Sequence, residues 1–212
     1  KGEVQPAVNE QRFLAVIPQA KGDLGFKWPV TLLDSAARLE EEARFFDDML
    51  SCVSAQFKVD ANCVSTAGIS AGALWVDQLV GVRGDWISSF MSLSGGTGGV
   101  IKPWVAPAHK MPAFVLWGGT GDNCLGQFSF DTMTKNLETA LTSGGHFVVE
   151  CLHNCGHAVP PFEAPPGGTT FRGLWQFALD HPFWLDPGQS PYNSGPLPTG
   201  MPEWCGVGVG GA

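Results

Sequence analysis

Charged side chains are scarce in this sequence, and basic ones are scarcer than acidic ones. Only 15% of the 212 residues are Asp, Glu, Lys or Arg, whereas about a quarter is usual in soluble domains. Lys and Arg number 12 against 20 Asp and Glu, which gives a formal net charge of −8 at pH 7. A nucleic-acid partner requires clustered basic residues, so the composition argues against one.

Long apolar runs are missing as well. A membrane-spanning helix needs about 18 or more consecutive apolar residues, and the sequence has no such stretch, so no membrane span is predicted. The C-terminus carries no lipidation motif. Apolar residues still make up 44% of the chain, enough for a sizeable core. The length fits one domain, or one domain with a tail.

None of the cysteines forms a CxxC pair. Their number is even, and the chain is rich in Gly and Pro, a composition that favours disulfides in a secreted or periplasmic protein. Free thiols in a cytosolic protein are the alternative. No signal peptide is visible, and the sequence begins at Lys1 rather than Met, which indicates processing or a missing stretch. The six cysteines are Cys52, Cys63, Cys124, Cys151, Cys155 and Cys205.

Short apolar runs alternate with amphipathic stretches along most of the chain. This order predicts an α/β fold with a mainly parallel sheet and helices on both faces. Functional sites of such sheets lie at the carboxyl ends of the strands. The expected strands span residues 13–17, 63–67, 86–93, 113–117 and 147–151, and the expected helices span 34–57, 71–80, 130–141 and 171–179.

The character of the chain changes after Asp186, where Pro and Gly dominate and periodicity is lost. Such composition alone indicates a linker. Trp204 and Cys205 suggest instead that this stretch is attached to the body. We therefore expect a catalytic domain over residues 1–185 and a tail over 186–212 packed on it.

One short motif stands between an expected strand and an expected helix. Gly68-Ile-Ser-Ala-Gly72 matches G-x-S-x-G, the pattern of a nucleophile elbow. In that turn the flanking positions approach neighbouring backbone and must be very small. Ser70 would then present its hydroxyl at the apex. The N–H of Ala71, at a helix N-terminus, could donate to an oxyanion.

A nucleophilic serine needs a base, and the base needs a group that orients it. In this fold class the acid and the histidine follow later strands. Asp122 falls after the 113–117 strand and His157 after the 147–151 strand. His153 in the same loop is the rival base. Asp131 is the rival acid, but it is placed as the N-cap of the 130–141 helix. The other histidines fall at the wrong sheet edge or past the last helix: His109, His146 and His181.

Cysteine and histidine alternate around His157, which raises a zinc site as an alternative. An extended segment from Cys151 to His157 would span roughly 20 Å, too far for one tetrahedral site. Disulfides fit better, because Cys124 and Cys155 each lie two residues from the candidate acid and base. A Cys124–Cys155 bond would lock the two loops, and the remaining proposed pairs are Cys52–Cys63 and Cys151–Cys205. No metal and no cofactor are expected.

Several stretches together resemble a known family. Asp47-Asp48-Met, Val59-Asp60-Ala-Asn-Cys-Val and Ala67-Gly-Ile-Ser-Ala-Gly72 are similar to segments of the secreted polyhydroxybutyrate depolymerase and feruloyl/acetylxylan esterase group. These are α/β-hydrolases. The resemblance implies a secreted serine hydrolase of carboxylic esters, such as a polyhydroxyalkanoate polyester or a feruloyl or acetyl ester. It also implies Ser70 as nucleophile, Asp122 as acid and His157 as base.

The sequence departs from that group at its start. The group has further strands and a His-Gly loop before the equivalent of Phe13, and that loop supplies a second oxyanion donor. We therefore expect an N-terminally incomplete catalytic domain, completed by a missing segment or a separate chain.

The substrate is less constrained than the reaction. Trp28, Trp75 and Trp104 fall in or near loops or beside the elbow, and a flat apolar surface there would suit a polyester or an aromatic ester. Most aromatic residues belong to cores, which is the simpler interpretation. Two other functions remain open: a peptidase on the same fold, and a non-catalytic binding protein that keeps it.

Overall fold

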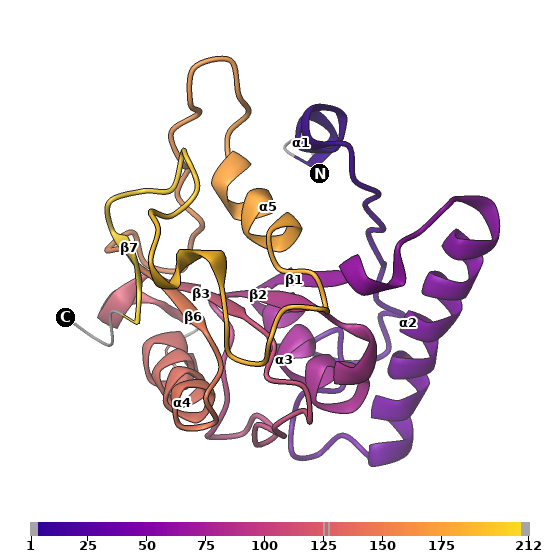
Figure 1. Ribbon diagram of the computed structural model, residues 1–212. Helices are drawn as coiled ribbons and strands as arrows, with labels where there is room; N and C mark the ends of the chain where they lie inside the picture. The colour runs from indigo at the N-terminus through magenta and orange to yellow at the C-terminus, as the bar shows by residue number, and fades with distance from the viewer. Residues whose placement is uncertain (1–3, 125, 127, 209–212) are drawn as a thin grey trace.

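A mainly parallel sheet forms the centre of the molecule. The computed structural model describes residues 4–124, 126 and 128–208. The strand order is β1-β2-β3-β6-β7 (Figure 1). The first four of these strands pair in parallel, and β7 pairs antiparallel with β6. The bounds are β1 Ser65–Ile69, β2 Ser89–Leu93, β3 Ala113–Trp117, β6 Val148–Leu152 and β7 Cys205–Val207, with a small separate hairpin of β4 Asn123–Cys124 and β5 Phe128–Ser129.

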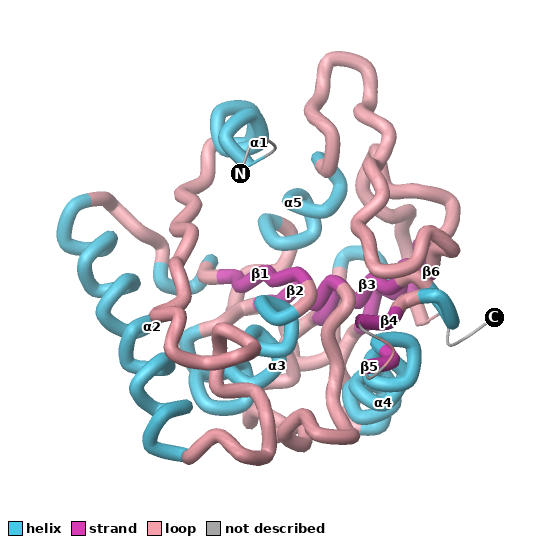
Figure 2. The backbone as a smooth tube through the Cα atoms, turned by 180° about the vertical axis from the view of Figure 1, so that it is seen from behind, coloured by secondary structure: helices cyan, strands magenta, loops and turns pink. Residues whose placement is uncertain are grey.

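Helices cover both faces of this sheet. In Figures 1 and 2, α2, α3 and α4 lie on one side, and α5 lies on the other with α1 beside it. Within the described residues, no helix is long and apolar enough to cross a bilayer. The helices are α1 Val4–Gln11, α2 Ala36–Gln56, α3 Ala71–Arg83, α4 Phe130–Ser143 and α5 Arg172–Leu179, joined by short 3₁₀ turns at Ala61–Cys63, Gly84–Trp86, Gly119–Gly121 and Pro191–Asn193.

Adjacent residues of each central strand enter different cores. Phe90 of β2 and Val115 of β3 pack with α3 and α4, whereas Met91 and Phe114 pack with α5. Because side chains of a strand alternate between faces, a sheet buried on both sides needs continuous apolar runs. The predicted α/β class, with a mainly parallel sheet between helices, is confirmed.

Element boundaries differ from the predicted ones by a few residues. The expected strand over 86–93 begins only at Ser89, because Gly84–Trp86 form a 3₁₀ turn. The long expected helix becomes α2, which begins after Ser35, whose hydroxyl accepts from the N–H of Arg38 at 3.2 Å. The α1 helix and the β7 strand were not among the predicted elements.

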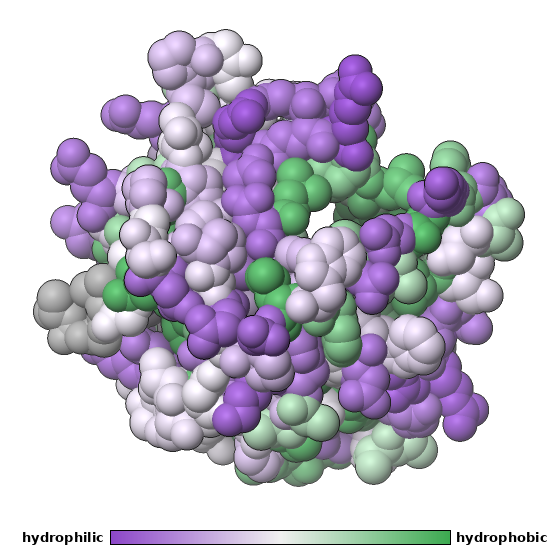
Figure 3. All heavy atoms as spheres, in the orientation of Figure 1, coloured by the Kyte–Doolittle hydropathy of each residue, from purple (hydrophilic) through white to green (hydrophobic). Residues whose placement is uncertain are grey.

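The expected buried strand over residues 13–17 is wrong. Phe13 packs on Trp175 of α5 with ring centroids 5.6 Å apart, but Leu14, Val16 and Ile17 are each about half exposed. Among the described residues, no backbone–backbone hydrogen bond joins 13–20 to a neighbour, and a strand needs such a partner. Figure 3 shows apolar residues bordering a hollow between α5 and the segment that follows α1.

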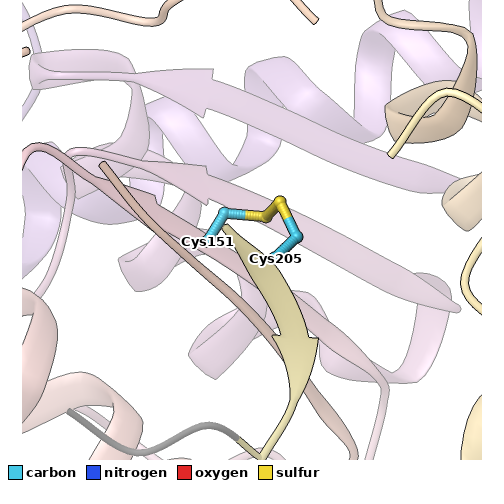
Figure 4. Close-up of a disulfide and its surroundings, with 2 residues drawn as sticks. All are labelled: Cys151 and Cys205. Atoms are coloured by element: carbon cyan, nitrogen blue, oxygen red, sulfur yellow. A yellow bond between two sulfur atoms is a disulfide. The ribbon is translucent and has the colours of Figure 1, made fainter. Parts of the chain in front are cut away.

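The Pro- and Gly-rich C-terminal stretch contacts the body at several points. Cys205 forms a disulfide with Cys151 (Figure 4), which confirms the predicted pairing of these two. His181 Nε2 lies 2.7 Å from Ser190 Oγ, and the Tyr192 hydroxyl donates to Asp180. The domain boundary at residue 185 stays a prediction.

The other two predicted disulfides are wrong, since Cys52, Cys63, Cys124 and Cys155 are free. Cys124 packs against the core on the α3–α4 side, whereas Cys155 is exposed, so the two sulfurs face different environments. Cys52 is exposed on α2, and Cys63 is exposed on the 3₁₀ turn that precedes β1.

We expect Cys205→Ser to lower the free energy of unfolding by about 4 kcal/mol, because it opens a covalent loop that joins residues 54 positions apart. Urea unfolding, with and without reductant, measures this. Cys52→Ser, which removes a free exposed thiol, is the control and should leave the transition unchanged. Equal stability of Cys205→Ser and the parent would contradict the inference.

Candidate active site

A sharp turn connects β1 to α3 and holds Ser70 at its apex. The backbone of Ser70 has φ 55° and ψ −123°, a conformation that non-glycine residues rarely adopt. Its N–H donates to the carbonyl of Leu93 at 2.9 Å, and its carbonyl accepts from the N–H of Leu74 at 3.0 Å. These bonds from two neighbouring elements hold the strained serine in place.

The two glycines of the G-x-S-x-G motif differ in the space around them. A Cβ on Gly68 would lie 2.2 Å from the carbonyl oxygen of Gly72, so no side chain fits there. A Cβ on Gly72 would meet nothing within 4 Å. The expectation that both flanking positions must be very small therefore holds for Gly68 and is wrong for Gly72.

Asp122 lies at the carboxyl end of β3, after the 3₁₀ turn Gly119–Gly121, and is fully buried. Its Oδ2 accepts from Ser94 Oγ at 2.7 Å and from the N–H of Gly118 at 2.9 Å. These two donors leave Oδ1 directed at the imidazole of His157. One carboxylate oxygen, Oδ2, is therefore held by two donors, and the other, Oδ1, contacts His157.

The imidazole of His157 connects the other two side chains. Its Nδ1 lies 2.7 Å from Asp122 Oδ1, and its Nε2 lies 2.9 Å from Ser70 Oγ. Because the carboxylate accepts, Nδ1 carries the proton in this pair and Nε2 is left to accept from the serine hydroxyl. The ring of Phe130 stacks on the imidazole, with centroids 4.5 Å apart and planes at 10°. Acid, imidazole and hydroxyl thus form one hydrogen-bonded chain.

Glycine also allows the acid loop and the histidine loop to approach each other. A Cβ on Gly118 would lie 1.9 Å from the carbonyl oxygen of Gly156. Gly156 itself has φ 67°, a left-handed conformation that glycine adopts at little cost. The two loops that a Cys124–Cys155 disulfide was expected to join therefore approach each other closely through their backbones at Gly118 and Gly156.

The rival acid and base have other partners. His153 is buried, its Nδ1 accepts from the N–H of Cys155 at 3.1 Å, and its ring lies edge-on to Trp204. Burial lowers the pKa of His153. Asp131 accepts from Trp117 Nε1 at 3.0 Å. The N-cap of α4 is Ser129, so the expectation that Asp131 caps that helix is wrong.

The tryptophans expected near the substrate are mostly buried. Trp28 and Trp75 stack on each other at 5.7 Å within the buried core on the α3–α4 side of the sheet. Trp104 is partly buried against Phe90, with ring centroids 6.0 Å apart. Their rings do not form the exposed flat surface that the sequence suggested.

The alternative zinc site loses one ligand, because Cys151 is bonded to Cys205. Within the part of the chain that the structure describes, no group of three or more His, Cys, Asp and Glu could hold a metal ion. The arrangement around Ser70 is instead suited to proton transfer along hydrogen bonds.

The first N–H groups of α3 face the same apex. A helix leaves its first N–H groups without intrahelical acceptors, and α3 begins at Ala71, directly after Ser70. A negatively charged oxygen formed beside Ser70 Oγ would lie near the N–H of Ala71 and the positive end of the α3 dipole.

Sequence reasoning missed two residues that support the site. Ser94 directly follows β2, and the topology places its strand between those of Ser70 and Asp122. The only feature of the sequence that could have identified Ser94 is its place directly after a strand of the parallel sheet. No feature of the sequence identifies Phe130, because its contact with His157 depends on how α4 packs.

Comparisons with known proteins identify the fold. No protein-family model and no curated protein sequence matches the chain. A serine-to-cysteine variant of pOPH in complex with DMSO superposes with a TM-score of 0.58 at 17% identity, over 78% of this chain and 59% of that one. Native sOPH gives 0.55 at 19% identity with the same coverage. A Bacillus cereus carboxylesterase gives 0.50 at 16% identity, over 63% and 60%.

These similarities, together with the sheet and its helices, show the α/β-hydrolase fold. The chain spans about three fifths of the length of each of these structures.

Alanine substitutions test the difference in available space at Gly68 and Gly72. Gly68→Ala should lower the free energy of unfolding by about 1–3 kcal/mol or more, because the turn must move to fit the methyl group. Gly72→Ala should be neutral or stabilising by up to about 1 kcal/mol, since it lies in a helix with open space. Chemical denaturation of both variants measures the difference, and an equal loss in the two would refute it.

Proposed function

We propose that this protein is a serine hydrolase that cleaves carboxylic esters through an acyl-enzyme intermediate. The observation that carries the proposal is the continuous chain from Asp122 through His157 to Ser70, with contacts of 2.7 and 2.9 Å. The fold supports it, because similar structures include a carboxylesterase and a complex of pOPH with pNPB.

In the proposed reaction, Ser70 Oγ attacks the ester carbonyl carbon while His157 Nε2 takes the hydroxyl proton. Asp122 keeps the proton of the resting imidazole on Nδ1 and stabilises the imidazolium that forms. His157 then gives its proton to the leaving alcohol as the carbon–oxygen bond breaks. Water, deprotonated by the same imidazole, then attacks the acyl carbon. As the bond between that carbon and Ser70 Oγ breaks, His157 returns the proton to Oγ, which releases the carboxylic acid and restores the serine hydroxyl.

The N–H of Ala71 is the proposed donor to the oxyanion of both tetrahedral intermediates. A second donor, which the resemblance assigns to a loop before Phe13, has no assigned counterpart among the described residues. Loss of one such donor typically lowers turnover by about 10²–10³-fold. The preceding strands and that loop, from a further segment or a separate chain, remain predictions.

The proposed substrates are a polyester such as a polyhydroxyalkanoate, or a feruloyl or acetyl ester, as the sequence resemblance implies. Secretion is part of the same proposal, because disulfides persist mainly in oxidising compartments and Cys151 is paired with Cys205. Contact of Trp28, Trp75 or Trp104 with substrate would require a rearrangement of their packed rings.

A fluorophosphonate probe tests the nucleophile. The protein should gain the mass of one phosphonyl group at Ser70, located by peptide mass spectrometry, and Ser70→Ala should gain none. His157→Ala should be labelled at least 10³-fold more slowly, because the base is gone. Ser89→Ala, which removes a serine at the other end of the sheet, should be labelled at the parent rate. Absence of label from a folded parent protein would count against catalysis and favour a binding protein.

Substrate comparison separates the two hydrolytic alternatives. Hydrolysis of p-nitrophenyl butyrate and of polyhydroxybutyrate oligomers is expected to exceed cleavage of matched peptides by a wide margin. The opposite preference would identify a peptidase on the same fold.

A further inference from the structure

Ser94 is the first residue after β2, is fully buried, and is not needed for the reaction steps above. Its hydroxyl donates to Asp122 Oδ2 at 2.7 Å. The opposite oxygen of that carboxylate is the one that holds His157. Together with the N–H of Gly118, which donates to the same Oδ2 at 2.9 Å, this bond from Ser94 restricts the rotation of the carboxyl group and so sets the direction of Oδ1.

We propose that Ser94 is a positioning residue that orients Asp122 toward His157. This inference rests on the proposed function, in which Asp122 is the acid. Ser94 touches neither substrate nor the reacting atoms and acts through the carboxylate alone.

Ser94 carries a side chain at a position where the backbone conformation favours glycine. Ser94 has φ 53°, in the left-handed region where glycine is the usual choice. Glycine occupies the next two positions, Gly95 and Gly96, but not this one. Glycine at 94 would relieve the strain and lose the donor to Asp122. The presence of serine at this strained position therefore supports a specific use of its hydroxyl.

The turn that carries Ser94 is held from both sides. The N–H of Ser94 donates to the carbonyl of Leu116 at 2.6 Å, which ties it to β3, the strand that leads to Asp122. From α3, the buried Asp77 accepts through Oδ2 from the N–H of Gly96 at 2.7 Å and from Ser92 Oγ at 3.1 Å. The backbone on both sides of Ser94 is thus held by hydrogen bonds, and the Ser94 hydroxyl donates to Asp122 from this fixed position.

Space at this turn is fully used. A Cβ on Gly95 would lie 2.2 Å from Ser92 Oγ and 2.7 Å from Asp77 Oδ2, and one on Gly96 would lie 2.2 Å from the carbonyl of Met133. Burial raises the pKa of Asp77 to about 7, so this carboxyl carries less charge near neutral pH than an exposed one. The turn cannot shift easily, which suits a fixed donor.

Ser94→Ala is the test variant, and Ser89→Ala is its matched control. Ser89 is also fully buried and is the first residue of β2, the strand that Ser94 follows, and its hydroxyl bonds Ser65 Oγ at 2.8 Å, at the amino ends of β1 and β2. Each change removes one buried hydroxyl, at one end or the other of β2, but only Ser94→Ala removes a donor from Asp122.

Two readouts are measured on the full chain. The first is kcat and KM for p-nitrophenyl butyrate. Ser94→Ala should lower kcat about 10- to 100-fold, the range expected for one hydrogen bond to a charged group, with KM unchanged. The second is the low-field proton resonance of His157 Nδ1–H, identified by its absence in His157→Ala. It should move or broaden in Ser94→Ala. Both readouts should be unchanged in Ser89→Ala.

The proposal is overturned if Ser94→Ala keeps the parent kcat and the parent resonance, or if Ser89→Ala changes both as much. If the parent protein neither hydrolyses esters nor reacts with fluorophosphonate, the proposed function fails. The proton resonance then decides alone: a change specific to Ser94→Ala supports positioning of Asp122, and no change refutes it.

Discussion

The parallel alignment of four neighbouring strands is the constraint on which the site depends. Ser70, Ser94, Asp122 and His157 follow β1, β2, β3 and β6, the order of those strands across the sheet. Since parallel strands end at one edge, residues up to 87 positions apart in the sequence lie within hydrogen-bonding distance of one another. Any slip in strand register would separate them, so the apolar residues of both cores also hold the geometry of the site.

Small residues make this convergence possible, at a cost in conformational strain. Gly68 lets the elbow close against Gly72, and Gly118 lets the acid loop touch the histidine loop at Gly156. Ser70, in contrast, keeps a side chain at positive φ. Strain of this kind typically costs about 1–3 kcal/mol per residue and persists only where the surroundings enforce it. Here the enforcing contacts are backbone hydrogen bonds from neighbouring elements.

The sequence predicted what depends on periodicity and on strand order. Strand–helix alternation was enough to place Ser70, Asp122 and His157 at one edge, and apolar runs identified β1, β2, β3 and β6 to within a few residues. Properties that depend on long-range packing could not be predicted in this way. Residues 13–17 have the composition of a buried strand, but among the residues that the structure describes none forms a backbone–backbone hydrogen bond with them.

The disulfide pairing also depends on long-range packing that the sequence pattern does not reveal. Proximity in sequence to the acid and base suggested a Cys124–Cys155 bond, yet the direction of each side chain depends on the local turn, which periodicity does not describe. Cys151 and Cys205 are paired because β7 adds to the sheet beside β6, in register with those two residues.

The coupling between Asp122 and His157 is the central physical claim, and a double-mutant cycle measures it most directly. The rate of fluorophosphonate labelling of Ser70 would be compared among the parent, Asp122→Ala, His157→Ala and the double variant. If the two residues act as one unit, the double variant should react about as slowly as the slower single variant. Losses that multiply, as for independent residues, would contradict the account.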